Sequence, residues 1–157
     1  MCLALGARFH LQSPRGVRVV PANDFFIDLY MTALAADEIL VAAEIDAVRQ
    51  GERVAFDEMS RRHGDYAIVG TCVQANASGG IVSNVRITQF GVGSTPIFSA
   101  NAAKTIEGSR PDASSIKSAC DALMEDIEPS DDLTMSAATK RYLASVQLER
   151  VLTRLAA

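Results

Sequence analysis

The chain has 157 residues, of which 48% are hydrophobic and 22% charged, and its net charge is −4. This length and composition suit one globular domain or two small ones, and the acidic balance argues against nucleic-acid binding. No apolar run approaches the about 20 residues that a membrane-spanning helix needs, and Met1 to Phe9 do not follow the plan of a signal peptide. We therefore expect a soluble, cytoplasmic protein.

The first twenty residues have the pattern of a β-hairpin. Ala7, Phe9 and Leu11 alternate with polar residues, which predicts a half-buried strand. Residues 13–16 (SPRG) have turn chemistry, and residues 17–20 (VRVV) predict the returning strand. Because an isolated hairpin is only marginally stable in water, we expect these strands to belong to a larger sheet.

A short helix and a third strand are predicted next. The helix begins at Asn23 or Asp24, either of which is suited to cap it, and it carries the apolar side chains of Phe25, Phe26, Leu29 and Tyr30. Residues 38–45 (EILVAAEI) predict a strand with Ile39, Val41 and Ile45 on one face. The short length and the alanines of this run leave a helix open as an alternative.

The second half predicts strands first and helices last. After a turn at residues 50–52, strands are expected at Val54–Met59, Ala67–Gln74 and Ile81–Phe90, the last two joined by the hairpin sequence 76–80 (NASGG). Helices are expected at Ser99–Glu107, Asp112–Ile127 and Ser136–Leu155. This order favours an α+β fold over repeated β-α-β units.

Residues with obvious chemistry are few. The sequence has no G-x-G-x-x-G, Walker or G-x-S-x-G motif, and Gly91-Val92-Gly93 is best interpreted as a tight turn. His63 lies in the polar segment 61–65 (RRHGD). A histidine without catalytic partners nearby in sequence is more often structural or at the surface than catalytic. The acidic pairs Asp37-Glu38, Asp57-Glu58 and Asp131-Asp132 are neighbours in sequence, so we expect solvated charges or caps. The three cysteines are too dispersed for a metal or iron–sulfur site and predict reduced, mostly buried thiols.

Several segments, in order, resemble one family, the FAD-binding medium subunits of the molybdenum hydroxylases, which include carbon monoxide dehydrogenase and xanthine dehydrogenase. The most specific resemblance is AFDEMSRRHGDYAIVG, which is similar to the pattern A-F-x4-R-R-x-G-D-[YF]-A of these subunits. The other similar segments are GARFHLQSPRGVRVVPANDFF, TALAADEIL, ITQFGVGSTPIFSANAAKTIEG and EPSDDLTMSAATKRYLASVQLERVL. Together they extend from about Ala7 to Leu155.

The resemblance implies a role in electron transfer. In this family, an iron–sulfur subunit carries electrons from a molybdopterin-binding subunit to FAD, which passes them to an external acceptor. The protein binds, orients and tunes the FAD, and the redox chemistry belongs to the cofactor. The resemblance further implies a soluble complex with these two partner subunits, without nucleic acid and without a membrane span.

The resemblance also predicts the domain organisation. Residues 1–50 are expected to be a remnant of the second FAD-binding subdomain, made of a hairpin, a short helix and a strand. Residues 51–157 are expected to be the C-terminal domain, with a small antiparallel sheet packed against about three helices. Family members hold the FAD pyrophosphate with two glycine-rich loops that do not occur in this sequence, and backbone N–H groups in such loops bind anions. We therefore expect a fragment or split form of the subunit, or a truncated gene product, that binds FAD weakly or not at all by itself.

Four residues match cofactor-binding positions of the family. Leu40 matches a position near the isoalloxazine ring, or alternatively is only a core residue if no FAD binds. Asp57 matches a lysine that contacts the flavin in xanthine-oxidising relatives, so the charge is reversed here. Tyr66 matches an aromatic residue beside the flavin, or alternatively packs on the sheet, and Asp65 precedes it as a contact or as a brace of the turn. The alternative function is a non-catalytic domain that docks the subunits of such a complex.

Overall fold

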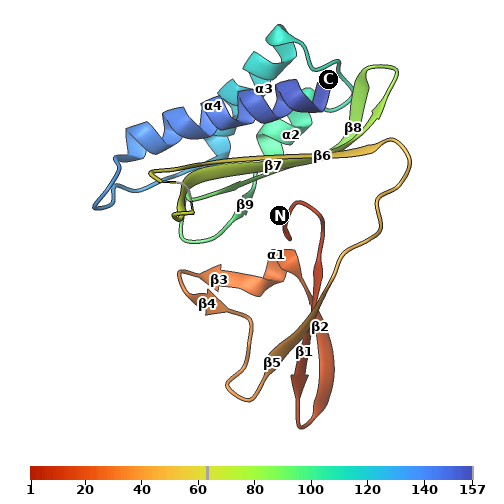
Figure 1. The fold of residues 1–157 in the computed structure, drawn as a ribbon, viewed down its shortest axis with the longest axis vertical. Helices are drawn as coiled ribbons and strands as arrows, with labels where there is room; N and C mark the ends of the chain where they lie inside the picture. Colours follow the sequence, from red (N-terminus) through yellow and green to blue (C-terminus); the bar gives the residue numbers. More distant parts are fainter. Residues whose placement is uncertain (63, 157) are drawn as a thin grey trace.

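The computed structural model describes residues 1–62 and 64–156 and confirms the predicted α+β class. Figure 1 shows three helices packed on one face of an antiparallel sheet, with a smaller set of strands from the N-terminal third on the other side of that sheet. Within the described residues, no helix is long and apolar enough to cross a membrane.

The N-terminal third contains a three-stranded sheet in the order β2-β1-β5. Its central strand is β1, which is antiparallel to both neighbours. The predicted strand at residues 38–45 is confirmed as a strand, and a small β3–β4 hairpin lies beside the sheet. The elements are β1 (Arg8–Ser13), β2 (Gly16–Pro21), α1 (Ala22–Phe25), β3 (Phe26–Asp28), β4 (Met31–Thr32) and β5 (Ile39–Glu44).

A small aromatic core limits the first helix. Phe9, Phe25 and Phe26 meet with ring centroids 4.3 to 6.0 Å apart, and Phe26 already has extended backbone angles. The prediction that Leu29 and Tyr30 belong to this helix is wrong, because the chain turns into the β3–β4 hairpin. Tyr30 has a φ of 57° in that turn and its side chain is fully exposed.

The larger sheet has the strand order β6-β7-β8-β9. Its long β7–β8 hairpin closes on Gly79 and Gly80, whose φ angles of 60° and 78° suit the tight turn that the sequence predicted. The strands are β6 (Glu52–Ser60), β7 (Ala67–Ser78), β8 (Ile81–Phe90) and β9 (Ile97–Phe98).

The main core lies between this sheet and the helices α2 (Ala100–Ile106), α3 (Ala113–Asp126) and α4 (Ala137–Ala156). The predicted apolar faces are confirmed: α3 buries Ile116, Cys120 and Leu123, and α4 buries Leu148, Val151, Leu152 and Leu155. This periodic burial is typical of helices that cover one side of a sheet.

Arg86 joins the N-terminal segment to the larger sheet. Its Nε donates to the carbonyl of Ala4 at 2.8 Å and its Nη2 to that of Leu3 at 2.9 Å. Arg86 also lies over the ring of Phe98, 5.4 Å from the centroid, a favourable cation–π distance. These contacts are on the sheet face opposite the helices, and they fix Met1–Gly6 against that face (Figure 1).

Candidate functional site

Leu40 lies on the edge strand of the smaller sheet. Register places Leu40 beside Leu11 of β1, and Leu11 in turn beside Arg18 of β2, so the three residues form a row on one face. Leu11 is buried, whereas Leu40 is 41% exposed. Because β5 pairs with β1 alone among the described strands, its outer backbone groups are open to a ligand or to another chain.

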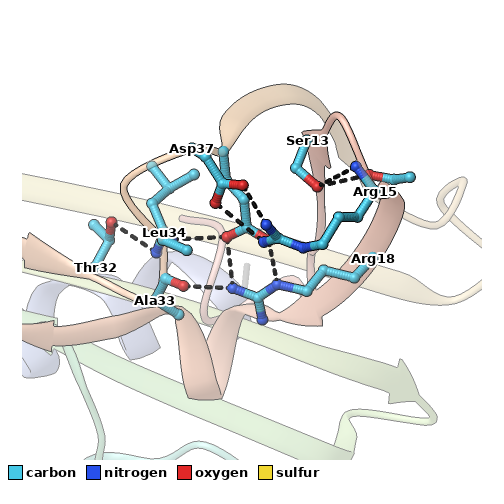
Figure 2. Close-up of polar contacts among 10 residues, drawn as sticks. Ser13, Arg15, Arg18, Thr32, Ala33, Leu34 and Asp37 are labelled. Atoms are coloured by element: carbon cyan, nitrogen blue, oxygen red, sulfur yellow. Dashed lines mark hydrogen bonds and ion pairs between the residues drawn. The ribbon is translucent and has the colours of Figure 1, made fainter.

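Two arginines of the β1–β2 hairpin hold the segment that leads into β5, as Figure 2 shows. Arg18 donates from Nε and Nη2 to the two oxygens of Glu38, at 2.6 and 2.8 Å. Its Nη2 also donates to the carbonyl of Ala33. Arg15 makes a second two-point contact, with Asp37. Paired N–H donors of this kind fix the geometry as well as the charge.

Glu38 is the more buried of the two acids. Its side chain is 5% exposed, against 42% for Asp37, and it also accepts from the backbone N–H of Ala35 at 2.8 Å. The prediction that this acidic pair is solvated or capping is therefore wrong for Glu38. Each acid instead pairs with a different arginine some twenty residues earlier in the chain.

The ion pair between Arg18 and Glu38 makes stability depend on pH. The Arg18 guanidinium, helped by the N–H of Ala35, lowers the pKa of Glu38 from 4.5 to about 2. A carboxyl whose pKa is lowered by folding stabilises the protein above its unfolded pKa, and this contribution disappears as pH falls toward the folded value.

We therefore expect the difference in unfolding free energy between wild type and Glu38→Gln to be constant above about pH 5 and to shrink between about pH 4.5 and pH 2. Urea unfolding curves at several pH values measure it. A difference that stays the same down to pH 2 would show that the ion pair does not couple folding to protonation of this group.

Asp65 and Tyr66 lie together in the turn between β6 and β7. Asp65 accepts from the backbone N–H of Tyr66 at 3.0 Å and lies 3.8 Å from the guanidinium of Arg61. Tyr66 is 95% exposed, so its ring does not pack on the sheet of this chain. A flat, accessible aromatic ring is suited to cover a planar ligand. His63 lies outside the described residues.

Asp57 lies on the helix side of the larger sheet, away from Leu40. It lies on the face of β6 that packs against α4, where its carboxylate is 3.0 Å from the guanidinium of Arg154. Arg86, which binds the N-terminal segment, is on the opposite face of the same sheet. The sheet therefore separates the side chain of Asp57 from the strand that carries Leu40.

The N-terminal N–H groups of three helices are hydrogen-bonded to side chains of the same chain. Asp126 accepts from the N–H groups of Asn101 and Ala102 in α2, both at 3.0 Å, and Asp112 accepts from those of Ser114 and Ser115 in α3. In α4, Ala137 donates to Asp131 at 2.6 Å. Free helix N-termini are common phosphate sites, but here carboxylates of the chain already occupy those of α2, α3 and α4.

Sequence reasoning missed the arginines that organise these segments. Arg15, Arg18 and Arg86 were not singled out, although the spacing of Arg15 and Arg18 across a turn sequence is one signal that could have identified the first two. Asp28 was missed as well: the N–H of Leu29, which bonds its carboxylate at 2.7 Å, and the hydroxyl of Ser94 lower its pKa.

Comparison with known proteins gives a consistent result. Residues 54–155 match the family described as CO dehydrogenase flavoprotein C-terminal domain. The carbon monoxide dehydrogenase medium chain of Hydrogenophaga pseudoflava is 32% identical over 97% of this chain and 53% of its own length. The caffeine dehydrogenase subunit beta of Pseudomonas sp. (strain CBB1) is 32% identical over 98% of this chain and 52% of its own length.

Solved structures agree. The carbon monoxide dehydrogenase structure from H. pseudoflava superposes with a TM-score of 0.93 at 32% identity, over 98% of this chain and 54% of that one. Quinoline 2-oxidoreductase from Pseudomonas putida 86 superposes with a TM-score of 0.90 at 32% identity, over 99% of this chain and 54% of that one. The chain thus spans about half the length of the relatives that it matches. We conclude that it belongs to the CO dehydrogenase flavoprotein C-terminal domain family and corresponds to the C-terminal part of a molybdenum hydroxylase medium subunit.

Proposed function

We propose that this chain forms the isoalloxazine side of the FAD site in a molybdenum hydroxylase. FAD, when bound, supplies the redox chemistry that links iron–sulfur clusters to an external electron acceptor. The residues of this chain orient the ring and limit its access to water. The proposal is supported by the open outer edge of β5 at Leu40 and by the exposed ring of Tyr66.

The edge of β5 has the chemistry that a flavin ring requires. Unpaired backbone N–H and C=O groups on an edge strand can bond to the amide-like groups of the isoalloxazine. Tyr66 offers a flat surface for stacking. Asp57, which pairs with Arg154 on the helix side of the sheet, is proposed to act on the packing of α4 rather than by direct contact with the ring.

The observation that carries the proposed division of the FAD site is that five groups suited to bind an anion, three helix N-termini and two arginines, are already engaged within the chain. The N-termini of α2, α3 and α4 are bonded to Asp126, Asp112 and Asp131. Arg15 and Arg18 are paired with Asp37 and Glu38. We infer that the FAD pyrophosphate is held by residues outside this sequence, in line with its lack of the family's glycine-rich loops.

The proposed organisation divides the chain near residue 50. Residues 1–50 complete the second FAD-binding subdomain, and residues 51–157 form the C-terminal domain. The proposed partners are an iron–sulfur subunit and a molybdopterin-binding subunit, because the relatives include a chain named as a subunit of a dehydrogenase complex. The electrons would then pass through FAD bound jointly by this chain and by residues that correspond to the other half of the relatives.

The experiment compares the chain alone with the complex purified through a tag on the chain. We expect the isolated chain to lose FAD on gel filtration and the complex to retain it. In the complex, Tyr66→Ala is expected to alter the visible absorption spectrum of the flavin, whereas Tyr142→Ala, which removes an exposed tyrosine of α4, is expected to leave it unchanged. Stoichiometric FAD on the isolated chain would refute the division of the site.

A second candidate, a docking domain without a role at FAD, is favoured by exposed apolar side chains. Most of the large ones lie between Val17 and Val48, including Val19, Ile39 and Val41, each at least half exposed. Exposed apolar patches often mark protein interfaces. Partner subunits that co-purify equally well with and without FAD, together with an unchanged flavin spectrum in Tyr66→Ala, would support this second candidate over the first.

A further inference from the structure

We propose that Arg18 is a positioning residue of the flavin site, which acts by clamping the segment Ala33–Glu38 and thereby fixes the backbone at Leu40. The inference rests on the proposed function. Arg18 does not itself need to contact the cofactor, since its guanidinium is already engaged by Glu38 and by the carbonyl of Ala33.

The clamp has three points of attachment on one short segment. Arg18 holds the carbonyl of Ala33 at the start of the segment (Figure 2). It also holds the carboxylate of Glu38 at the end of the segment. Glu38 also accepts from the backbone N–H of Ala35 at 2.8 Å. The N–H of Ala33 donates to the carbonyl of Phe25 at 2.8 Å. Both the N–H and the carbonyl of Ala33 are therefore hydrogen-bonded.

Strand register connects the clamp to Leu40. Arg18, Leu11 and Leu40 lie side by side across β2, β1 and β5, and adjacent strands are about 4.8 Å apart. Glu38 lies directly before β5 and two residues before Leu40. A displacement of Glu38 therefore moves the backbone that carries Leu40, although a shift between His10 and Leu11 makes this part of the β1–β5 pairing irregular.

Arg15 provides the matched control. It belongs to the same hairpin and pairs with Asp37, the neighbour of Glu38. That pair is exposed, with side-chain exposures of 72% and 42%, whereas the Glu38 side chain is 5% exposed. Exposed ion pairs contribute little, so Arg15→Ala is expected to change hydrogen exchange in residues 33–41 and the flavin spectrum much less than Arg18→Lys does.

The experiment uses the assembled complex and three variants, Arg18→Lys, Glu38→Gln and the double variant. Lysine keeps the positive charge but loses the two-point contact. We expect backbone amides of residues 33–41 to exchange hydrogen on the order of tenfold faster, and FAD to bind on the order of tenfold more weakly, as follows from the loss of one charged hydrogen bond. The flavin absorption spectrum is expected to shift equally in both single variants, with no further change in the double variant.

The possible results separate positioning from simple stabilisation. A lower melting temperature with an unchanged flavin spectrum and unchanged FAD affinity would overturn the positioning role of Arg18 while leaving the proposed function intact. Unchanged hydrogen exchange in residues 33–41 would overturn the clamp itself. A wild-type complex that contains no FAD would overturn the proposed function and this inference with it.

Discussion

Replacing Gly91 by alanine is expected to destabilise the protein by about 3 kcal/mol or more, because two independent costs add. Gly91 follows β8 with a φ of 78°, a backbone conformation that costs other residues about 1–2 kcal/mol. A Cβ at this position would lie 2.1 Å from the carbonyl oxygen of Ile68 and 2.9 Å from its carbonyl carbon. Both atoms belong to the backbone of β7 and cannot move aside as a flexible side chain would.

The measurement is urea unfolding followed by circular dichroism, and Gly93 provides the control two residues away. A Cβ on Gly93 would meet only the carbonyl oxygen of Thr95, at 3.9 Å, which is ordinary contact. We expect Gly93→Ala to lie within about 0.5 kcal/mol of wild type. Equal effects of the two substitutions would mean that neither the positive φ of Gly91 nor its close approach to β7 makes a side chain at this position unfavourable.

Truncating Leu148 to alanine is expected to cost about 3 kcal/mol. Leu148 is fully buried in α4, in the core between this helix and the larger sheet. Its removal loses the transfer free energy of the side chain and leaves a cavity that neighbours fill only in part. Because α4 covers β6 and β7, the same substitution is expected to lower the melting temperature of the whole second half of the chain.

Leu133 is the matched control for this truncation. It lies between α3 and α4 and is fully exposed, so Leu133→Ala is expected to change the unfolding free energy by less than about 0.5 kcal/mol. Thermal unfolding of the two variants, measured side by side, shows whether the loss of stability comes from truncating a buried leucine or from truncating any leucine. A loss of stability in Leu133→Ala as large as that in Leu148→Ala would show that this segment is covered in solution by another chain.

Local patterns in the sequence predicted most of the secondary structure. The alternation around Phe9 and the turn sequence before Ile81 each act within a few residues, and each element formed where it was expected. The expected cap at Asn23 or Asp24 is wrong, because α1 begins after Pro21 without a side-chain cap. The first helix was predicted too long because the packing of Phe25 and Phe26 on Phe9, a contact across the hairpin, directs the chain into β3 after four helical residues.

The candidate site was predictable only in part. The resemblance assigned Leu40, Asp57, Asp65 and Tyr66, but it contained no information on which side chains face each other in this chain. Side chains alternate between the two faces of a strand, and the face that becomes the core depends on what packs against it. Only the position of α4 decided that Asp57 pairs with Arg154, away from Leu40.

The sequence by itself determined the α+β order of elements, the helix faces that become buried and the family to which the chain belongs, since these follow from short-range periodicity and from ordered motifs. Tertiary structure alone decided that Arg18 reaches Glu38 and that the N-terminus of α2 is bonded to the carboxylate of Asp126. Such contacts join groups that are in some cases more than twenty residues apart. Their energy depends on distance and burial, which exist only once the strands and helices have packed.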